Sequence, residues 1–130
     1  MKTKTIRQTV TFKESPGEVY SILMDSKKHS AFTQSECKIG KKVGGKISAY
    51  DGYIEGENLE LVPGKKIVQK WRSGDWPAGH FSKVIFEFMA KGKGTELKFM
   101  HQGVPENDFK EKSEGWKEHY WEKMKLLIGV

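Results

Sequence analysis

Between residues 43 and 102 the sequence alternates apolar and polar residues, and turn signals interrupt the alternation at short intervals. Asp51-Gly52, Pro63-Gly64 and the K-G-K-G of residues 91–94 are typical of tight turns. Gly103–Pro105 is expected to stop the sheet. The tail then changes to helical spacing, with apolar residues at Trp116, Tyr120, Met124 and Leu127. A run of hairpins followed by a long helix predicts an α+β fold, with one face of an antiparallel sheet covered by helix.

The N-terminal segment predicts one strand and two short helices. Residues 4–13 partly alternate, which is typical of a half-buried strand. Ser15 can cap a helix, Pro16 suits its first position, and Glu18 follows three residues after the cap. A second short helix is expected over Lys28–Phe32.

The strand alternation also predicts which side chains face the final helix. Gln69 and His101 fall on the inward face although they are polar. A buried polar group needs a partner or water, so two interpretations stay open. Either both residues are satisfied within the core or at the sheet rim, or they belong to a ligand cavity between sheet and helix. The second interpretation predicts a cavity lined by Gln69, Trp71, Phe86, Phe99, His101, Trp116 and Tyr120.

Length and composition narrow the class of protein. A chain of 130 residues predicts one domain, 1–130. The single Cys37 excludes an intramolecular disulfide, and no apolar run reaches membrane-span length. No secretory signal is visible at the start, so we expect a soluble, cytoplasmic protein and a monomer.

The net charge of +6 favours an acidic partner. Only Arg7 and Arg72 are arginines, whereas nucleic-acid recognition favours arginine. We therefore do not expect nucleic acid as the partner. The remaining basic residues are lysines, which form either a solvated face or a docking patch for an acidic protein surface. The lysines that could gather there are Lys27, Lys28, Lys41, Lys42, Lys46, Lys65 and Lys66.

Nothing in the sequence points to catalysis or to a cofactor. The four histidines are far apart, and no cysteine pair accompanies them, so no metal site is expected. The segment G-K-K-V-G-G-K (40–46) lacks the spacing of a phosphate-binding loop. It is better explained as a glycine-permitted bend. Spacing alone does not reveal which carboxylates meet across a cavity, and no pair is indicated.

The loop W-R-S-G-D-W-P-A-G-H-F-S (71–82) is the most unusual segment. Trp71 ends a strand and is expected to point inward. Trp76 lies between two strands, where it would either cover the cavity mouth or meet a partner, or fold back onto the sheet edge. Aromatic residues and arginine are enriched at interface hot spots. The first docking candidates are therefore Arg72 and Trp76, with Lys65 and Lys66 behind them.

Several segments together carry a family resemblance. The chain resembles the C-terminal domain of the activators of heat-shock protein 90 (Hsp90) ATPase, in the same order and over nearly its whole length. The matching segments are S-P-G-E-V-Y (15–20), A-F-T (31–33), V-G-G-K-I-S-A-Y-D-G-Y-I-E-G (43–56), L-V-P-G-K-K-I-V-Q-K-W-R (61–72), W-P-A-G-H-F-S (76–82), G-T-E-L (94–97), G-V-P (103–105) and G-W-K-E-H-Y-W (115–121).

The resemblance implies a helix-grip fold of the START-like (SRPBCC) superfamily, in which a curved antiparallel sheet grips a long C-terminal helix. It also implies a non-enzymatic co-chaperone that docks on Hsp90 and stimulates its ATPase. Other superfamily members carry apolar ligands, so a carrier or sensor of a small apolar, lipid-like ligand is the alternative, and a cyclase-type enzyme is a third. The N-terminal domain of the full-length co-chaperone is expected to be missing, because the first strand starts almost at Met1.

Overall fold

The structure, a computed structural model, describes residues 2–33, 37–50 and 52–127. Within these residues seven strands form one antiparallel sheet in the order β1-β7-β6-β5-β4-β3-β2. The strands are β1 (Thr3–Phe12), β2 (Lys38–Ile39), β3 (Lys46–Ala49), β4 (Ile54–Val62), β5 (Lys66–Ser73), β6 (Ser82–Lys91) and β7 (Gly94–Pro105). The helices are α1 (Pro16–Met24), α2 (Ser26–Thr33), η1 (Glu106–Asp108), α3 (Phe109–Gly115), η2 (Trp116–Trp121) and α4 (Glu122–Leu127).

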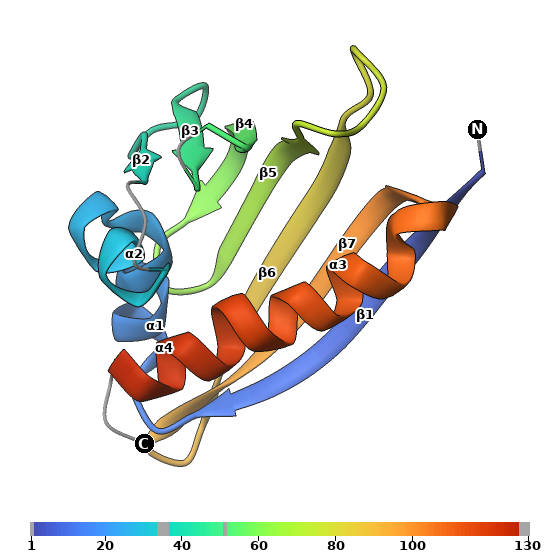
Figure 1. Cartoon of the computed structure of the whole chain (residues 1–130). Helices are drawn as coiled ribbons and strands as arrows, with labels where there is room; N and C mark the ends of the chain where they lie inside the picture. The colour runs from blue at the N-terminus through green and yellow to red at the C-terminus, as the bar shows by residue number, and fades with distance from the viewer. Residues whose placement is uncertain (1, 34–36, 51, 128–130) are drawn as a thin grey trace.

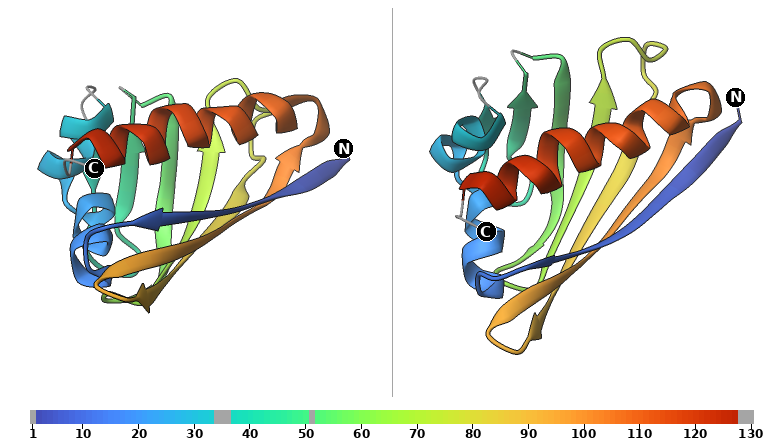
Figure 2. Two further views of the ribbon diagram at one scale, coloured as in Figure 1. Left: turned by 90° about the horizontal axis from the view of Figure 1, so that it is seen from below. Right: turned by 60° about the horizontal axis from the view of Figure 1, so that its bottom comes forward.

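The last three of these run on as one C-terminal helix that lies along the concave face of the curved sheet (Figures 1 and 2). Its middle section, η2, has the wider π-helical winding. The two short helices α1 and α2 cover the end of the sheet near α4 (Figure 1). This arrangement confirms the predicted helix-grip fold. None of the helices in the described ranges has both the length and the apolar character needed to cross a membrane.

Local sequence signals explain where the N-terminal helices begin. The Ser15 hydroxyl accepts a hydrogen bond from the Glu18 amide at 3.4 Å, and Pro16 occupies the first turn, as predicted. The second helix begins two residues before the expected Lys28, because the Asp25 carboxylate accepts a hydrogen bond from the Lys28 amide at 3.0 Å. That hydrogen bond is the main reason why the pKa of Asp25 lies below its ordinary value.

The predicted end of the sheet was wrong. The segment Gly103–Pro105 continues β7, and Val104 and Pro105 pair with Lys4 and Thr3 of β1. The register shifts between Lys4 and Ile6, which is where Gly103 adopts a φ of 81°. A glycine at positive φ lets the strand absorb an extra residue as a bulge and stay paired.

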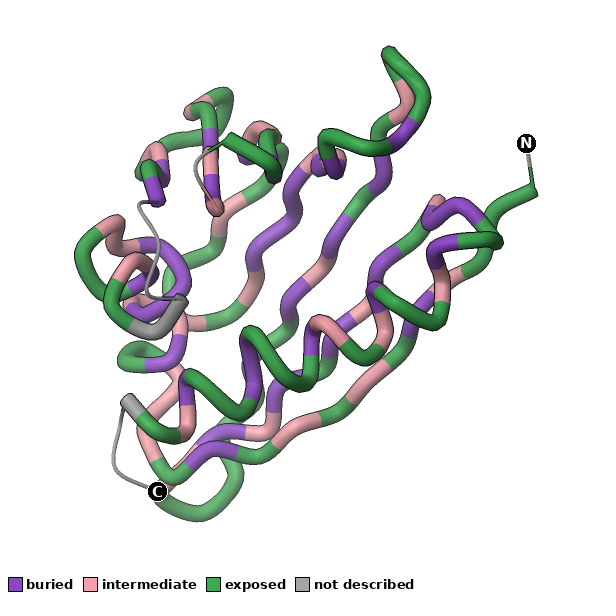
Figure 3. The backbone as a smooth tube through the Cα atoms, in the orientation of Figure 1, coloured by how far each residue is buried: buried purple, intermediate pink, exposed green. Residues whose placement is uncertain are grey.

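The inward faces are those that the alternation predicts. Buried residues recur along the central strands and on the facing side of the C-terminal helix (Figure 3). The inward residues of β5, β6 and β7 are all at most 7% exposed: Ile67, Gln69, Trp71, Val84, Phe86, Phe88, Leu97, Phe99 and His101. On the helix, Trp116, Tyr120, Trp121 and Met124 are buried against them. Of the remaining residues predicted for this helix face, Ile128 lies outside the described residues.

Candidate functional site

The space between sheet and helix is filled by the chain's own aromatic side chains. The cavity left there is about 20 Å³, which is room for one water molecule. Five residues predicted to line a cavity do line it: Gln69, Trp71, Phe86, Trp116 and Tyr120. The other two, Phe99 and His101, pack behind it, with ring centroids 4.4 and 5.7 Å from that of Trp116. The predicted open, ligand-sized cavity is therefore absent from this part of the described structure.

The two inward polar residues are both satisfied inside the core. The Gln69 amide donates to Asn58 Oδ1 at 3.1 Å. In turn, Asn58 Nδ2 donates to the carbonyls of Gly40 and Lys42 at 2.6 and 3.1 Å. This chain of hydrogen bonds ties the glycine-rich bend to β4 and β5. The structure thus favours the first of the two interpretations of Gln69, a structural role.

The hydrogen bonds around His101 define its neutral form. The Trp116 indole donates to His101 Nδ1 at 3.1 Å, so Nδ1 must be an acceptor. The Ser82 hydroxyl donates to the Trp71 carbonyl at 2.8 Å and can therefore accept from His101 Nε2–H at 2.7 Å. Burial, with the nearby Lys112 charge adding to it, lowers the pKa of His101 to about 3. His101 is thus a fixed neutral core residue at neutral pH.

A second buried histidine connects α2 to the C-terminal helix. His29 Nδ1 lies 2.9 Å from the Leu23 carbonyl, and Nε2 lies 2.9 Å from the Tyr120 hydroxyl. Burial lowers the pKa of His29 to about 4. The cavity lining predicted from the sequence includes Tyr120 but not His29. The sequence did not indicate a role for His29, because the partners of its ring lie in other elements.

Of the alternatives left open for Trp76, the structure favours the one in which the side chain folds back onto the sheet. Its side chain is 6% exposed, and it packs at 5.5 Å between ring centroids from Trp71 and from His80. The indole donates to Asp108 Oδ2 at 2.7 Å. The indole N–H exchanges a water partner for a buried carboxylate, which makes a charge-assisted and therefore stronger hydrogen bond.

The four docking candidates do not lie together. The Arg72 guanidinium donates to the carbonyls of Trp76 and Pro77 at 2.7 and 3.2 Å, so it holds the loop. Lys65 and Lys66 are at the opposite end of β5. Arg72 is six residue steps along the strand from Lys66, or roughly 20 Å. The first docking candidates, Arg72 and Trp76, therefore lie far from the second pair, Lys65 and Lys66, and whether either pair meets a partner stays a prediction.

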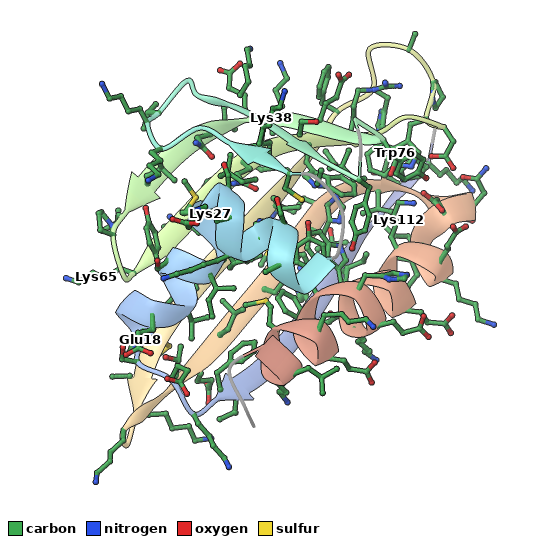
Figure 4. The ribbon with its side chains drawn as sticks, turned by 60° about the vertical axis from the view of Figure 1, so that its left-hand side comes forward. Glu18, Lys27, Lys38, Lys65, Trp76 and Lys112 are labelled. Atoms are coloured by element: carbon green, nitrogen blue, oxygen red, sulfur yellow. The ribbon has the colours of Figure 1, made fainter. Side chains whose placement is uncertain are left out.

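Lysines from several elements lie on the side of the molecule formed by α1, α2 and the turns of β2–β5. Lys27 of α2, Lys38 of β2 and Lys65 of the β4–β5 turn are labelled there (Figure 4). Two of the predicted lysines are paired with acids: Lys46 with Glu57 at 2.6 Å and Lys66 with Glu60 at 3.6 Å. We call this surface the lysine face and define it by Lys27, Lys38 and Lys65.

A polar network links the loop to the helix, and it was not predicted from the sequence. Asp108 accepts from Trp76 and pairs with Lys112 Nζ at 3.0 Å. Lys112 Nζ also lies 3.5 Å from the Tyr53 hydroxyl, which donates to Asp75 at 2.9 Å. Burial opposes the charge of Lys112, but the hydrogen bond and the charge of Asp108 raise its pKa above the ordinary value. The i, i+4 spacing of Asp108 and Lys112 is the one local signal for this network.

A curved antiparallel sheet closed on a C-terminal helix, with a core full of its own aromatics, places the chain among the helix-grip proteins. The sequence profile of the family described as "Activator of Hsp90 ATPase homolog 1-like protein" matches residues 13–129. The chain belongs to this family.

Individual relatives agree with the family match. The "Activator of 90 kDa heat shock protein ATPase homolog" of Dictyostelium discoideum is 39% identical over 95% of this chain, and the human homolog 1 is 36% identical over 92%. The match covers 32% and 35% of those two proteins, so the chain spans about a third of their length. The crystal structure of an Hsp90 activator from Plasmodium falciparum superposes with a TM-score of 0.92 at 26% identity, covering 96% of both chains.

Proposed function

We propose that this chain is a co-chaperone domain that docks on Hsp90 and stimulates its ATPase without catalysing a reaction itself. The observation that carries the proposal is the family match over residues 13–129, together with relatives named as activators of that ATPase. The filled interior supports it, because a carrier buries most of its ligand, whereas the cavity enclosed between sheet and helix has room for a single water molecule and the larger cleft beside the helix is open to solvent. The ligand-carrier alternative finds no support.

The stimulation has a defined thermodynamic requirement. A docking domain raises a partner's ATPase rate only if it binds the hydrolysing conformation more tightly than the resting one. Raising the population of that conformation tenfold from a small starting value needs about tenfold tighter binding, or ~1.4 kcal/mol. One protein surface can supply this, and no catalytic residue in the domain is needed.

The lysine face is the proposed docking surface. Its exposed lysines suit an acidic protein surface, and the encounter is accelerated by their charge. Lys65 and Lys66 belong to this side of the molecule. Arg72 and Trp76 would influence docking indirectly, by holding the exposed loop residues Pro77–Gly79 in place. We place the protein in the cytoplasm as a monomer, where it would meet the chaperone.

The test is the steady-state ATPase rate of Hsp90 with this domain added. The double charge reversal Lys27→Glu with Lys65→Glu is expected to weaken docking. The domain concentration that gives half-maximal stimulation should therefore rise at least tenfold. Lys123→Glu, on the exposed side of α4, is the matched control and is expected to change it less than twofold. The effect should shrink above about 0.5 M salt, because screening removes exposed charge interactions. If the parent domain does not stimulate the ATPase, the proposed function is rejected. If the double variant and Lys123→Glu have equal effects, the lysine face is rejected as the docking surface.

A further inference from the structure

An open cleft of about 390 Å³ separates the β3–β4 turn from the C-terminal helix. It is distinct from the small interior cavity, although Ile54, Trp71, Trp116 and Tyr120 contribute to both. Its volume lies within the range of small-ligand and side-chain pockets. The aromatic part of its lining comprises Tyr50, Tyr53, Trp71, Trp116 and Tyr120.

Carboxylates crowd the helix side of the cleft. Glu111, Glu114 and Glu118 line it from one helix face, spaced three and four residues apart. The two other polar residues of that helix at the cleft are Lys112 and His119. Lys112 is already paired with Asp108 at 3.0 Å, and the His119 ring packs edge-on against Tyr50 at 6.2 Å. The cleft therefore carries an excess of negative charge on a chain whose net charge is +6.

The chain itself shows how a cation is accommodated at this wall. The Lys112 ammonium lies 5.6 Å from the centre of the Tyr53 ring, within cation–π distance. It reaches the cleft from the helix, so an external cation that meets the neighbouring rings and the free carboxylates would repeat the same contacts. Aromatic faces combined with carboxylates suit a planar guanidinium better than an ammonium, because a guanidinium stacks and can contact two carboxylates at once.

We propose that this cleft binds an arginine side chain, flanked by apolar residues, from a partner protein. Tyr50 and Tyr53, the least buried of the aromatic lining, would take the stem and the guanidinium plane, and Glu114 and Glu118, about one helical turn apart, would take the charge. The cleft is opposite in charge to the lysine face. It therefore suits a basic segment of a partner, whereas the lysine face suits an acidic surface. The inference rests on the proposed docking function only in taking the source of the arginine to be a protein.

The test is titration of the whole chain with a capped Leu-Arg-Leu-Gly peptide and with its citrulline analogue. Citrulline keeps the shape of arginine and removes its charge. Binding is followed by tryptophan fluorescence and by the shifts of the Trp71 and Trp116 indole NMR signals. We expect the arginine peptide to bind at least tenfold more tightly than the citrulline peptide, and its affinity to fall as salt is raised.

Two variants localise the binding. Glu114→Gln with Glu118→Gln is expected to weaken the arginine peptide at least tenfold, and Glu122→Gln, on the same helix outside the cleft, to leave it within twofold. All three glutamates are exposed, so thermal melts should confirm an intact fold. Equal affinity for both peptides, or equal binding by the cleft variant and the parent, would overturn the inference. The titration contains no chaperone, so its failure is separate from a failure of ATPase stimulation.

Discussion

At the scale of single residues, the tryptophans of this domain are anchors with two kinds of contact. Trp76, Trp116 and Trp121 bury their rings, and each indole N–H also donates to an internal acceptor: Asp108, His101 and Gln8. Gln8 in turn donates to the Ser113 carbonyl at 2.8 Å. The side-chain amide of Gln8 therefore links β1 to the C-terminal helix through both its oxygen and its nitrogen. Removing such a residue costs apolar burial and leaves a polar partner unsatisfied.

Two substitutions at Trp76 separate these contributions. Trp76→Ala is expected to lower the free energy of unfolding by about 3–5 kcal/mol, through the lost burial and the cavity that remains. Trp76→Phe keeps much of the ring volume and removes the bond to Asp108, so we expect a loss of about 1–3 kcal/mol. Urea denaturation of both variants measures this. A Trp76→Ala domain as stable as the parent would contradict the buried position of the loop.

At the scale of elements, the bulge in β7 lets one strand run the full length of the sheet. Gly103 takes a φ of 81° at the register shift and brings its carbonyl to His80 Nε2 at 2.9 Å. The bulge therefore joins β1, β7 and the loop before β6 at one point. A residue with a Cβ in that left-handed conformation is strained.

Replacing glycine by alanine should change the stability of the domain in opposite directions at positions 103 and 17. Gly103→Ala is expected to destabilise the domain by about 1–2 kcal/mol, because alanine is strained at positive φ. Gly17 lies in α1, without positive φ, and an added Cβ would meet nothing within 4 Å. Gly17→Ala should therefore stabilise by about 0.5–1 kcal/mol. Thermal melts of the pair test this, and a shift of the same sign in both would refute the bulge.

The elements also show how far sequence alone reaches. Period and turn signals predicted β4, β5, β6 and the C-terminal helix, because these depend on neighbours along the chain. They failed at Gly103–Pro105, where pairing with β1 decides the outcome. They also left Trp76 open, because its acceptor, Asp108, lies 32 residues away. The lysine face and the cleft beside the C-terminal helix are formed by elements that are distant in sequence. No local sequence pattern predicts which of these elements come into contact.

At the scale of the whole molecule, two buried neutral histidines set its response to acid. His101 holds β7 to the C-terminal helix and His29 holds α2 to it. Burial lowers their pKa values to about 3 and about 4. An unfolded histidine has a pKa of about 6.5. Below that pH the unfolded chain binds protons that the folded chain cannot, so stability falls as the pH falls.

The pH dependence is measurable above the range in which carboxylates titrate. Between pH 6.5 and 5, each buried histidine is expected to remove up to about 1.4 kcal/mol of stability per pH unit. Denaturant midpoints at pH 7, 6 and 5 provide the measurement. His29→Gln should flatten this slope, because it removes one of the two buried histidines. A stability that stays constant from pH 7 to 5 would disprove neutral burial of both residues.

The strand order also has a consequence for how the chain is made. Within the part of the chain that the structure describes, β1 is an edge strand whose one neighbour is β7, with Phe12 opposite Thr95 and Thr3 opposite Pro105. On a ribosome, β1 emerges long before its partner exists, and its inward Ile6 and Phe12 stay uncovered until most of the chain has been synthesised. The hairpins from β4 to β6 form from neighbouring segments and can be complete by then. Closing the sheet with a strand so distant in sequence slows folding relative to a helical bundle of equal length. Until the sheet closes, the nascent chain carries an apolar strand without its neighbour, and such transiently exposed surface is prone to aggregate.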